Sequence, residues 1–209
     1  MRVVLLGGAG YIGSVASHHL VSLGHHVTVV DGLIYNRGDH PGRLLPGAAT
    51  FVNGDLRDLD LLARVSDSAD AVVHLGGIVG EPACQLDEEL AVELNYAAPM
   101  LAAETVAAVV PGSKIQRGPE RDEADARDYR VSFTRLQQRI PGACSATLKD
   151  GVQEIADLLV TRQIIDPAEP QYDNHRGLAE AFTAGMVASL RTPGCRRYLA
   201  DYTAAWGQQ

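Results

Sequence analysis

The feature that most constrains the fold is a glycine-rich turn close to the start of the chain. A run of four apolar residues, 3–6, leads into Gly7, and apolar residues then recur at helical spacing from 11 to 23 before Gly24. Such a short apolar run, partly β-branched, predicts a strand buried on both faces, as is usual in a parallel sheet. The helical repeat followed by glycine predicts a crossover helix that ends there. We therefore expect a strand, a tight turn and a helix, in that order.

Three further strands are predicted at intervals that suit the same sheet. They cover residues 26–30, 50–53 and 71–75, and a helix is expected at 59–65. Strands that alternate with helices form right-handed βαβ units. The predicted fold class is therefore α/β, a doubly wound Rossmann-like parallel sheet of strand order 3-2-1-4 at least, with an α-rich C-terminal segment.

The second half of the chain gives a more mixed pattern. Apolar spacing predicts one long helix over residues 87–110, which ends at Pro111. Residues 116–130 are crowded with charges and predict a solvated loop or a ligand-facing arm, followed by a short strand at 130–133. A helix with Asp150 in its first turn is expected at 147–160, and another at 177–190.

Gly7, Gly10 and Gly13 form a G-x-x-G-x-x-G pattern between the first strand and the first helix. Glycines allow a tight turn there and let a pyrophosphate approach the backbone N–H groups at the start of the helix. This context predicts that the chain binds a dinucleotide. Tyr11 and Ile12 lie inside the same turn and are expected to contact the ligand.

Asp31 lies 18 residues after Gly13, at the end of the second predicted strand. A carboxylate at that place accepts hydrogen bonds from the ribose hydroxyls of the adenosine and repels a 2'-phosphate. NAD is therefore the predicted cofactor. NADP stays the less favoured alternative because Arg37 lies nearby.

Several motifs beyond the glycine turn resemble one known family. GGAGYIGS, VVD ending at Asp31, GDLRD at 54–58, VVHLGG at 72–77 and then Asn95 resemble the extended short-chain dehydrogenases/reductases. Within them the chain is similar to the NAD-dependent sugar-nucleotide epimerases and dehydratases. The resemblance implies two further sets of cofactor contacts. Asp55 and Leu56 would lie beside the adenine, and the segment after the fourth strand would pack along the cofactor, namely Gly76, Gly77 and Ile78.

The resemblance resumes near residue 109, after a gap. The family carries a catalytic Ser or Thr and a Tyr-x-x-x-Lys pair between the two matching stretches. Lys114 and Lys149 are the only lysines of the 209 residues, and Val110 and Ser145 stand four positions before them, so the pair is missing. We therefore expect a dinucleotide-binding domain at 1–110. Residues 111–209 would be a remnant of the substrate-binding region plus C-terminal helices, packed on it.

Candidate catalytic groups lie after the fourth strand, where open α/β sheets bind ligands. Glu81 is a candidate general acid or base, and Cys84 a candidate nucleophile. The competing interpretations are a solvated loop carboxylate and a small buried hydrophobe. Arg121 and Arg127 are candidates for binding an anionic substrate, and a salt-bridged surface loop is the alternative.

Composition excludes several classes of partner. The formal net charge is -8 at pH 7 without a basic stripe, so we expect no nucleic-acid partner. The three cysteines are far apart and no His-rich cluster accompanies them, which predicts no metal site. The first apolar run is too short for a signal peptide or a membrane span, so a cytoplasmic location without membrane contact is expected. The fourth strand is too apolar to stay exposed to water, so another element must cover it. The candidates are the C-terminal region of the chain, a second copy and a different protein, and we favour a homodimer.

Two hypotheses for function remain open at the level of sequence. The first is an NAD-binding enzyme that performs redox chemistry, isomerisation, elimination or cyclisation on a small metabolite without the tyrosine mechanism. The second is a non-catalytic NAD-binding regulatory or partner subunit. A degenerate gene remnant is disfavoured because the helix pattern and the C-terminal motifs continue past the gap.

Overall fold

The computed structural model describes residues 1–35, 45–116, 132–140, 142, 145–161, 166, 168, 174–183 and 193–206. The chain divides into two compact units, one of Met1–Gln116 with Pro170–Gln209 and one of Arg117–Glu169. The first unit holds the sheet and most of the helices. The predicted domain division at residue 110 stays a prediction.

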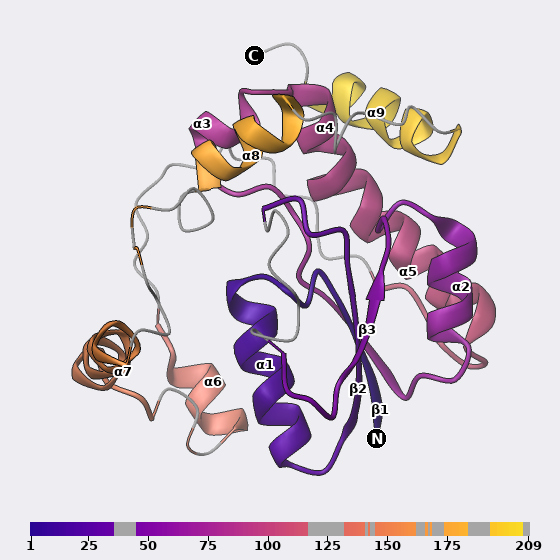
Figure 1. Cartoon of the computed structure of the whole chain (residues 1–209). Coiled ribbons are helices and arrows are strands. Elements are labelled where there is room, and N and C mark those ends of the chain that lie inside the picture. Colours follow the sequence, from indigo (N-terminus) through magenta and orange to yellow (C-terminus); the bar gives the residue numbers. More distant parts are fainter. Residues whose placement is uncertain are drawn as a thin grey trace. The chain divides into compact units, whose positions relative to one another are not determined.

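Four parallel strands form the sheet of the first unit (Figure 1). Their order is β3 (Thr50–Asn53), β2 (His26–Asp31), β1 (Arg2–Leu6) and β4 (Ala71–His74). Leu6 of β1 pairs with Val30 of β2 and with His74 of β4, so three strands reach their carboxyl ends at the same level. The predicted fold class and the order 3-2-1-4 are confirmed.

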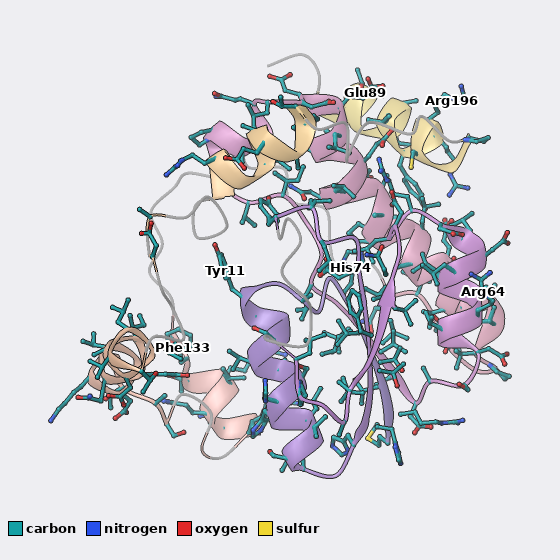
Figure 2. The ribbon with its side chains drawn as sticks, in the orientation of Figure 1. Tyr11, Arg64, His74, Glu89, Phe133 and Arg196 are labelled. Atoms are coloured by element: carbon teal, nitrogen blue, oxygen red, sulfur yellow. The ribbon has the colours of Figure 1, made fainter. Side chains whose placement is uncertain are left out.

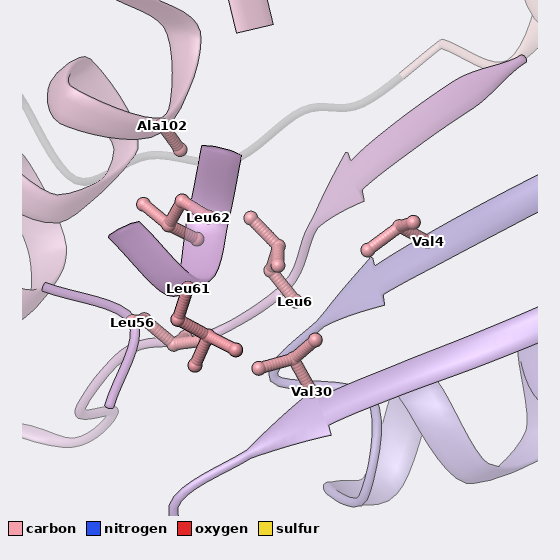
Figure 3. Close-up of a cluster of buried hydrophobic side chains, with 7 residues drawn as sticks. All are labelled: Val4, Leu6, Val30, Leu56, Leu61, Leu62 and Ala102. Carbon is pink, nitrogen blue, oxygen red and sulfur yellow. The ribbon is translucent and has the colours of Figure 1, made fainter. Parts of the chain in front are cut away.

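Helices cover both faces of this sheet. Successive side chains of β1 point to opposite faces, so each set packs against different helices. Val4 and Leu6 pack against α2 (Leu59–Ser66) and α5 (Ala98–Val109). Figure 3 shows this cluster, to which α2 contributes Leu62 and α5 contributes Ala102. Val3 and Leu5 face α1 (Tyr11–Ser22) on the other side. β1 is therefore buried on both faces, as its continuous apolar run predicts.

A π-helical turn interrupts the long helix that was predicted over residues 87–110. The segment consists of α4 (Glu88–Val92), the π-turn η2 (Glu93–Ala97) and α5. Pro99 lies in the first turn of α5 and has no N–H to donate to the carbonyl of Asn95, so the regular ladder fails at that point. A wider turn accommodates the defect, and such turns are frequent at functional sites. The predicted helical segment is confirmed to within one residue at each end, but its interruption by the π-turn was not predicted.

Two helices from the end of the chain complete the first unit. α8 (Asn174–Thr183) packs near α3 (Glu81–Cys84), and α9 (Pro193–Trp206) packs on η2. Cys195 and Tyr198 of α9 are buried against Ala97 and Leu101. The helix predicted at 177–190 therefore starts earlier than expected, and its residues 184–190 lie outside the described part. α9 was not predicted.

The second unit contains α6 (Thr134–Arg139) and α7 (Leu148–Val160). The Thr147 side chain accepts a hydrogen bond from the Asp150 amide, and Asp150 bonds back to Thr147, which makes a capping box. The predicted helix at 147–160 is thus confirmed. Ser132 and Phe133 do not form the expected strand, and the rest of that prediction lies outside the described residues.

Candidate functional site

Gly7 closes the turn after β1 in a conformation that favours glycine, with φ at +76°. Its amide donates to the carbonyl of Val30 at 2.7 Å, which ties the turn to β2. A Cβ at Gly7 would come within 2.3 Å of the Gly76 Cα, in the segment after β4. The turn after β1 and the segment after β4 are therefore in backbone contact, and no side chain fits between them.

The other two glycines of the motif have different tasks. A Cβ at Gly13 would meet the Gly8 Cα at 2.4 Å, so Gly13 lets the first turn of α1 lie on the strand-to-helix turn. A Cβ at Gly10 would meet only the carbonyl oxygen of Gly7, at an ordinary 3.6 Å. The protein itself therefore needs glycine at positions 7 and 13. At position 10 its described atoms leave room for a side chain.

The start of α1 carries no side-chain cap. Gly10 is the N-cap residue in an extended conformation and makes no side-chain hydrogen bond to the first turn. Tyr11 and Ile12 are 60% and 71% exposed, and Figure 2 shows Tyr11 projecting beyond the end of the helix. An uncapped helix start with backbone N–H groups and a positive dipole end is suited to an anion.

Asp31 stands beside this turn at the end of β2. One carboxylate oxygen accepts the amide of Ala9 at 2.9 Å, and the other accepts the amide of Leu33 at 2.8 Å. Burial raises the pKa of Asp31, while these two hydrogen bonds work in the opposite direction. The two amides hold the carboxylate in one orientation against the glycine turn, and each oxygen retains a further lone pair for a ligand hydroxyl.

Asp55 and Leu56 follow β3, and the side chains of both make contacts within the chain. The Asp55 carboxylate accepts three hydrogen bonds from Arg57, one from the backbone amide and two from the guanidinium. Arg57 is buried and also donates to the fully buried Glu93 of the π-turn at 2.5 Å. Leu56 packs in the core under Gly76. These contacts link the segment after β3 to the long helix.

The π-turn also holds the segment after β4. Asn95 accepts the Ile78 amide at 2.7 Å and donates to the Ile78 carbonyl at 2.8 Å, a pair of bonds that fixes this backbone. A Cβ at Gly77 would come within 2.7 Å of the Asn95 side-chain oxygen. Gly76, Gly77 and Ile78 are thus rigidly placed beside the glycine turn.

The candidate catalytic residues are less well defined. Glu81 begins α3, but its side chain lies outside the described part of the structure. Cys84 is half-buried and its thiol donates to the carbonyl of Ile78 at 3.6 Å, a contact that favours a structural thiol over a nucleophile. Arg121 and Arg127 lie outside the described residues. No group of three potential metal ligands occurs among the residues that are described.

Two residues that the sequence analysis did not single out have unusual surroundings. His74 lies at the end of β4, and its Nε2 is buried without a hydrogen-bond partner among the described atoms. Burial lowers the pKa of His74. Tyr35 received no prediction, although it lies only four residues after Asp31, at the ligand-binding end of a parallel sheet. That position was the one signal by which it could have been found.

The glycine cradle, the uncapped helix and the fixed carboxylate define a Rossmann-like dinucleotide-binding protein. A family model described as the NAD dependent epimerase/dehydratase family matches residues 3–118, more than half of the chain. The chain belongs to the NAD dependent epimerase/dehydratase family. The resemblance inferred from the motifs is confirmed. NAD is confirmed as the cofactor because the family is one of NAD-dependent proteins.

Individual relatives match part of the chain. The chain is 39% identical over 85 residues to a UDP-glucose 4-epimerase of Streptomyces lividans, which covers 38% of this chain and 25% of that protein. It is 34% identical over 92 residues to a UDP-glucose 4-epimerase of Klebsiella pneumoniae, covering 39% of this chain and 63% of that protein. The match therefore spans less than two thirds of either relative.

Two solved structures are also similar to part of the chain. A crystal structure of UDP-glucose 4-epimerase is 31% identical and covers 50% of this chain and 31% of that one, with a TM-score of 0.45. The enzyme WbmF of Bordetella bronchiseptica, in complex with NAD+, is 30% identical and covers 50% of this chain and 32% of that one, also with a TM-score of 0.45.

None of the described helices has the length and apolar character of a membrane span.

Proposed function

We propose that the chain binds NAD across the carboxyl end of the sheet, with the pyrophosphate at the start of α1. The observation that carries this proposal is the open position at Gly10, beside an uncapped helix and the fixed carboxylate of Asp31. Asp31 would accept hydrogen bonds from the adenosine ribose. Further contacts are proposed for the remaining turn and the segments after β3 and β4, namely Gly7, Tyr11, Ile12, Gly13, Asp55, Leu56, Gly76, Gly77 and Ile78.

A pair of glycine substitutions tests this assignment. Gly10→Ala adds a methyl group that the protein tolerates, since its nearest contact is 3.6 Å away, but the group would stand where the pyrophosphate approaches. Gly47→Ala adds the same group where nothing lies within 4 Å. We expect both variants to keep the thermal midpoint of the wild type, and only Gly10→Ala to lose NAD affinity in calorimetric titration. Equal affinities in the two variants would refute the assignment.

We further propose that the chain is an enzyme, which acts on a small and specialised metabolite. NAD supplies a hydride acceptor or donor when bound, and the residues of the chain would bind, orient and protonate the substrate around it. Glu81 is the proposed general acid or base, because it begins α3 directly after the segment that Asn95 fixes. Cys84 would line the substrate site. Arg121 and Arg127 would bind an anionic group of the substrate.

The test of the enzymatic proposal compares two glutamates of neighbouring short helices. Glu81→Gln should abolish substrate-dependent reduction of NAD, whereas Glu88→Gln, at an exposed position of α4, should leave it unchanged. Candidate substrates can be screened by the absorbance of NADH. Turnover that survives in Glu81→Gln would remove this residue from the mechanism.

A non-catalytic NAD-binding subunit is the second candidate. It is favoured by one observation, the missing Tyr-x-x-x-Lys pair, since neither Lys114 nor Lys149 has a tyrosine four residues before it. Such a subunit would bind NAD with the same residues. It would not reduce the cofactor with any substrate, and it would instead co-purify with a larger partner.

We also propose a homodimer and a cytoplasmic location. β4 stands at the end of the described sheet, and Val73 is 40% exposed on it, so a second copy would cover this strand. Light scattering at micromolar concentration should give twice the mass of the chain, and a monomer would contradict the dimer. Cell fractionation tests the location.

A further inference from the structure

α9 is fixed to the π-turn η2 and to α5 by a small buried contact. Cys195 and Tyr198 of α9 are 0% and 3% exposed. They form one cluster with Ala97 of η2 and Leu101 of α5. The ring of Tyr198 also meets the ring of Tyr96 edge to face, with the ring centroids 5.9 Å apart. Such aromatic pairs add to the stabilisation that apolar burial gives. α9 therefore packs directly on the last two residues of η2.

A carboxylate of α5 holds the same part of α9. Glu104 accepts the hydroxyl of Tyr198 with one oxygen and the guanidinium of Arg197 with the other, the latter at 2.7 Å. The Arg197 guanidinium also lies 4.5 Å from the centre of the Tyr198 ring, a distance at which cation and ring attract each other. Arg197 and Glu104 are partly exposed, so water weakens their ion pair. Tyr198 combines the buried ring with the contact to the carboxylate and is therefore the main anchor of α9.

The same turn holds two segments of the proposed NAD site. Asn95 fixes the segment after β4 through its two hydrogen bonds with Ile78. Glu93 binds Arg57, which in turn holds Asp55 after β3. All of these contacts start within the five residues of η2. Two side chains of the turn thus support the cofactor segments, and the next two residues carry α9.

The geometry of η2 matters for both sets of contacts. π-helical turns are rare and short, so the packing around them must select their geometry. A change of one residue in the hydrogen-bond ladder would rotate one side of η2 against the other by about 100°. The contacts from Glu93 to Arg57 and from Asn95 to Ile78 could not both survive such a rotation. The packing of α9 on η2 opposes it.

We propose that α9 sets the NAD affinity of this chain through η2, with Tyr198 as the positioning residue. With α9 in place, η2 keeps the geometry in which Asn95 and Glu93 fix the two cofactor segments. With α9 released, these segments are held less firmly and NAD binds more weakly. Coupling between two sites is reciprocal, so bound NAD in turn stabilises the position of α9. The inference rests on the proposed NAD site and adds a control of its affinity from outside the cofactor contacts.

The first test compares the loss of the Tyr198 hydroxyl with a destabilising change elsewhere. Tyr198→Phe should lower NAD affinity about five- to tenfold in calorimetric titration, at the lower end of typical couplings between sites. Val27→Ala is the control, since this buried residue lies near the start of β2, at the opposite end of the sheet from the glycine turn. It should lower the thermal midpoint at least as much as Tyr198→Phe and leave NAD affinity unchanged.

The second test needs no substitution. Amide exchange in α9 should slow by about five- to tenfold when the wild type is saturated with NAD, because the coupling acts in both directions. A contact of α9 that only stabilises the fold would give local exchange that does not depend on NAD.

The possible results separate this inference from the proposed function. If the wild type does not bind NAD, the proposed function fails and the inference fails with it. If the wild type binds NAD, but Tyr198→Phe binds it within about twofold and α9 exchange does not respond to NAD, the NAD site stands and the role of α9 is overturned. An equal loss of affinity in Val27→Ala would also overturn it, because a general loss of stability would then explain both results.

Discussion

Replacing Glu93 should be one of the most damaging single changes to this fold. The side chain is fully buried in the π-turn and pairs with Arg57, whose side chain is only 2% exposed. Removal of one partner leaves the other as a buried charge without its counterpart, which typically costs about 3–5 kcal/mol. Because Asp55 still holds the rest of the guanidinium, we expect Glu93→Ala to fall at the lower end of that range.

The assay is urea unfolding followed by circular dichroism, with two further variants for comparison. Asp70→Ala removes an exposed pair with Arg2, in which the side chains are 44% and 58% exposed, and should barely move the midpoint. The double variant Arg57→Met with Glu93→Leu removes both buried charges and should be more stable than Glu93→Ala alone. A Glu93→Ala protein as stable as Asp70→Ala would refute this reasoning, as would a double variant less stable than the single one.

Two other predictions concern single side chains. Burial lowers the pKa of His74 in the folded chain, so stability is complete above its ordinary pKa of about 6.5 and falls as the pH drops through the lower folded-state value. In His74→Gln the thermal midpoint should therefore depend less on pH between pH 5 and 8 than in the wild type. An unchanged dependence would show that other groups cause it. Thr147→Ala removes the N-cap of α7 and should weaken that helix by about 1 kcal/mol. Amide exchange in α7 should accelerate, while exchange in β1 stays constant.

The sequence predicted the sheet well because each strand carries its own signal. The apolar run before Gly7 and the run that ends near Asp31 are buried by neighbouring elements, so local composition and tertiary burial agree there. The run that ends near Asn53 is only partly buried. The glycine motif was equally informative. Backbone atoms lie so close to positions 7 and 13 that only glycine fits there, and the glycines are visible in the sequence.

What the sequence did not predict depends on contacts between distant segments. Arg57 and Glu93 are 36 positions apart, and nothing in either neighbourhood identifies them as partners. Tyr35 packs against a cluster to which α8 contributes, and the residues of α8 lie more than a hundred positions away in the sequence. The π-turn had one visible cause, Pro99, but apolar periodicity outweighed it. α9 begins at Pro193, and proline is a helix-start signal that the sequence analysis did not use.

The most direct test of the account is a calorimetric titration of NAD and of NADP into the whole chain. Asp31 is held beside the glycine turn by two backbone amides, so a 2'-phosphate would meet a fixed carboxylate. We predict saturable binding of one NAD per chain and affinity for NADP weaker by about tenfold or more. Absence of saturable NAD binding would contradict the account, and equal or tighter binding of NADP would contradict the role of Asp31.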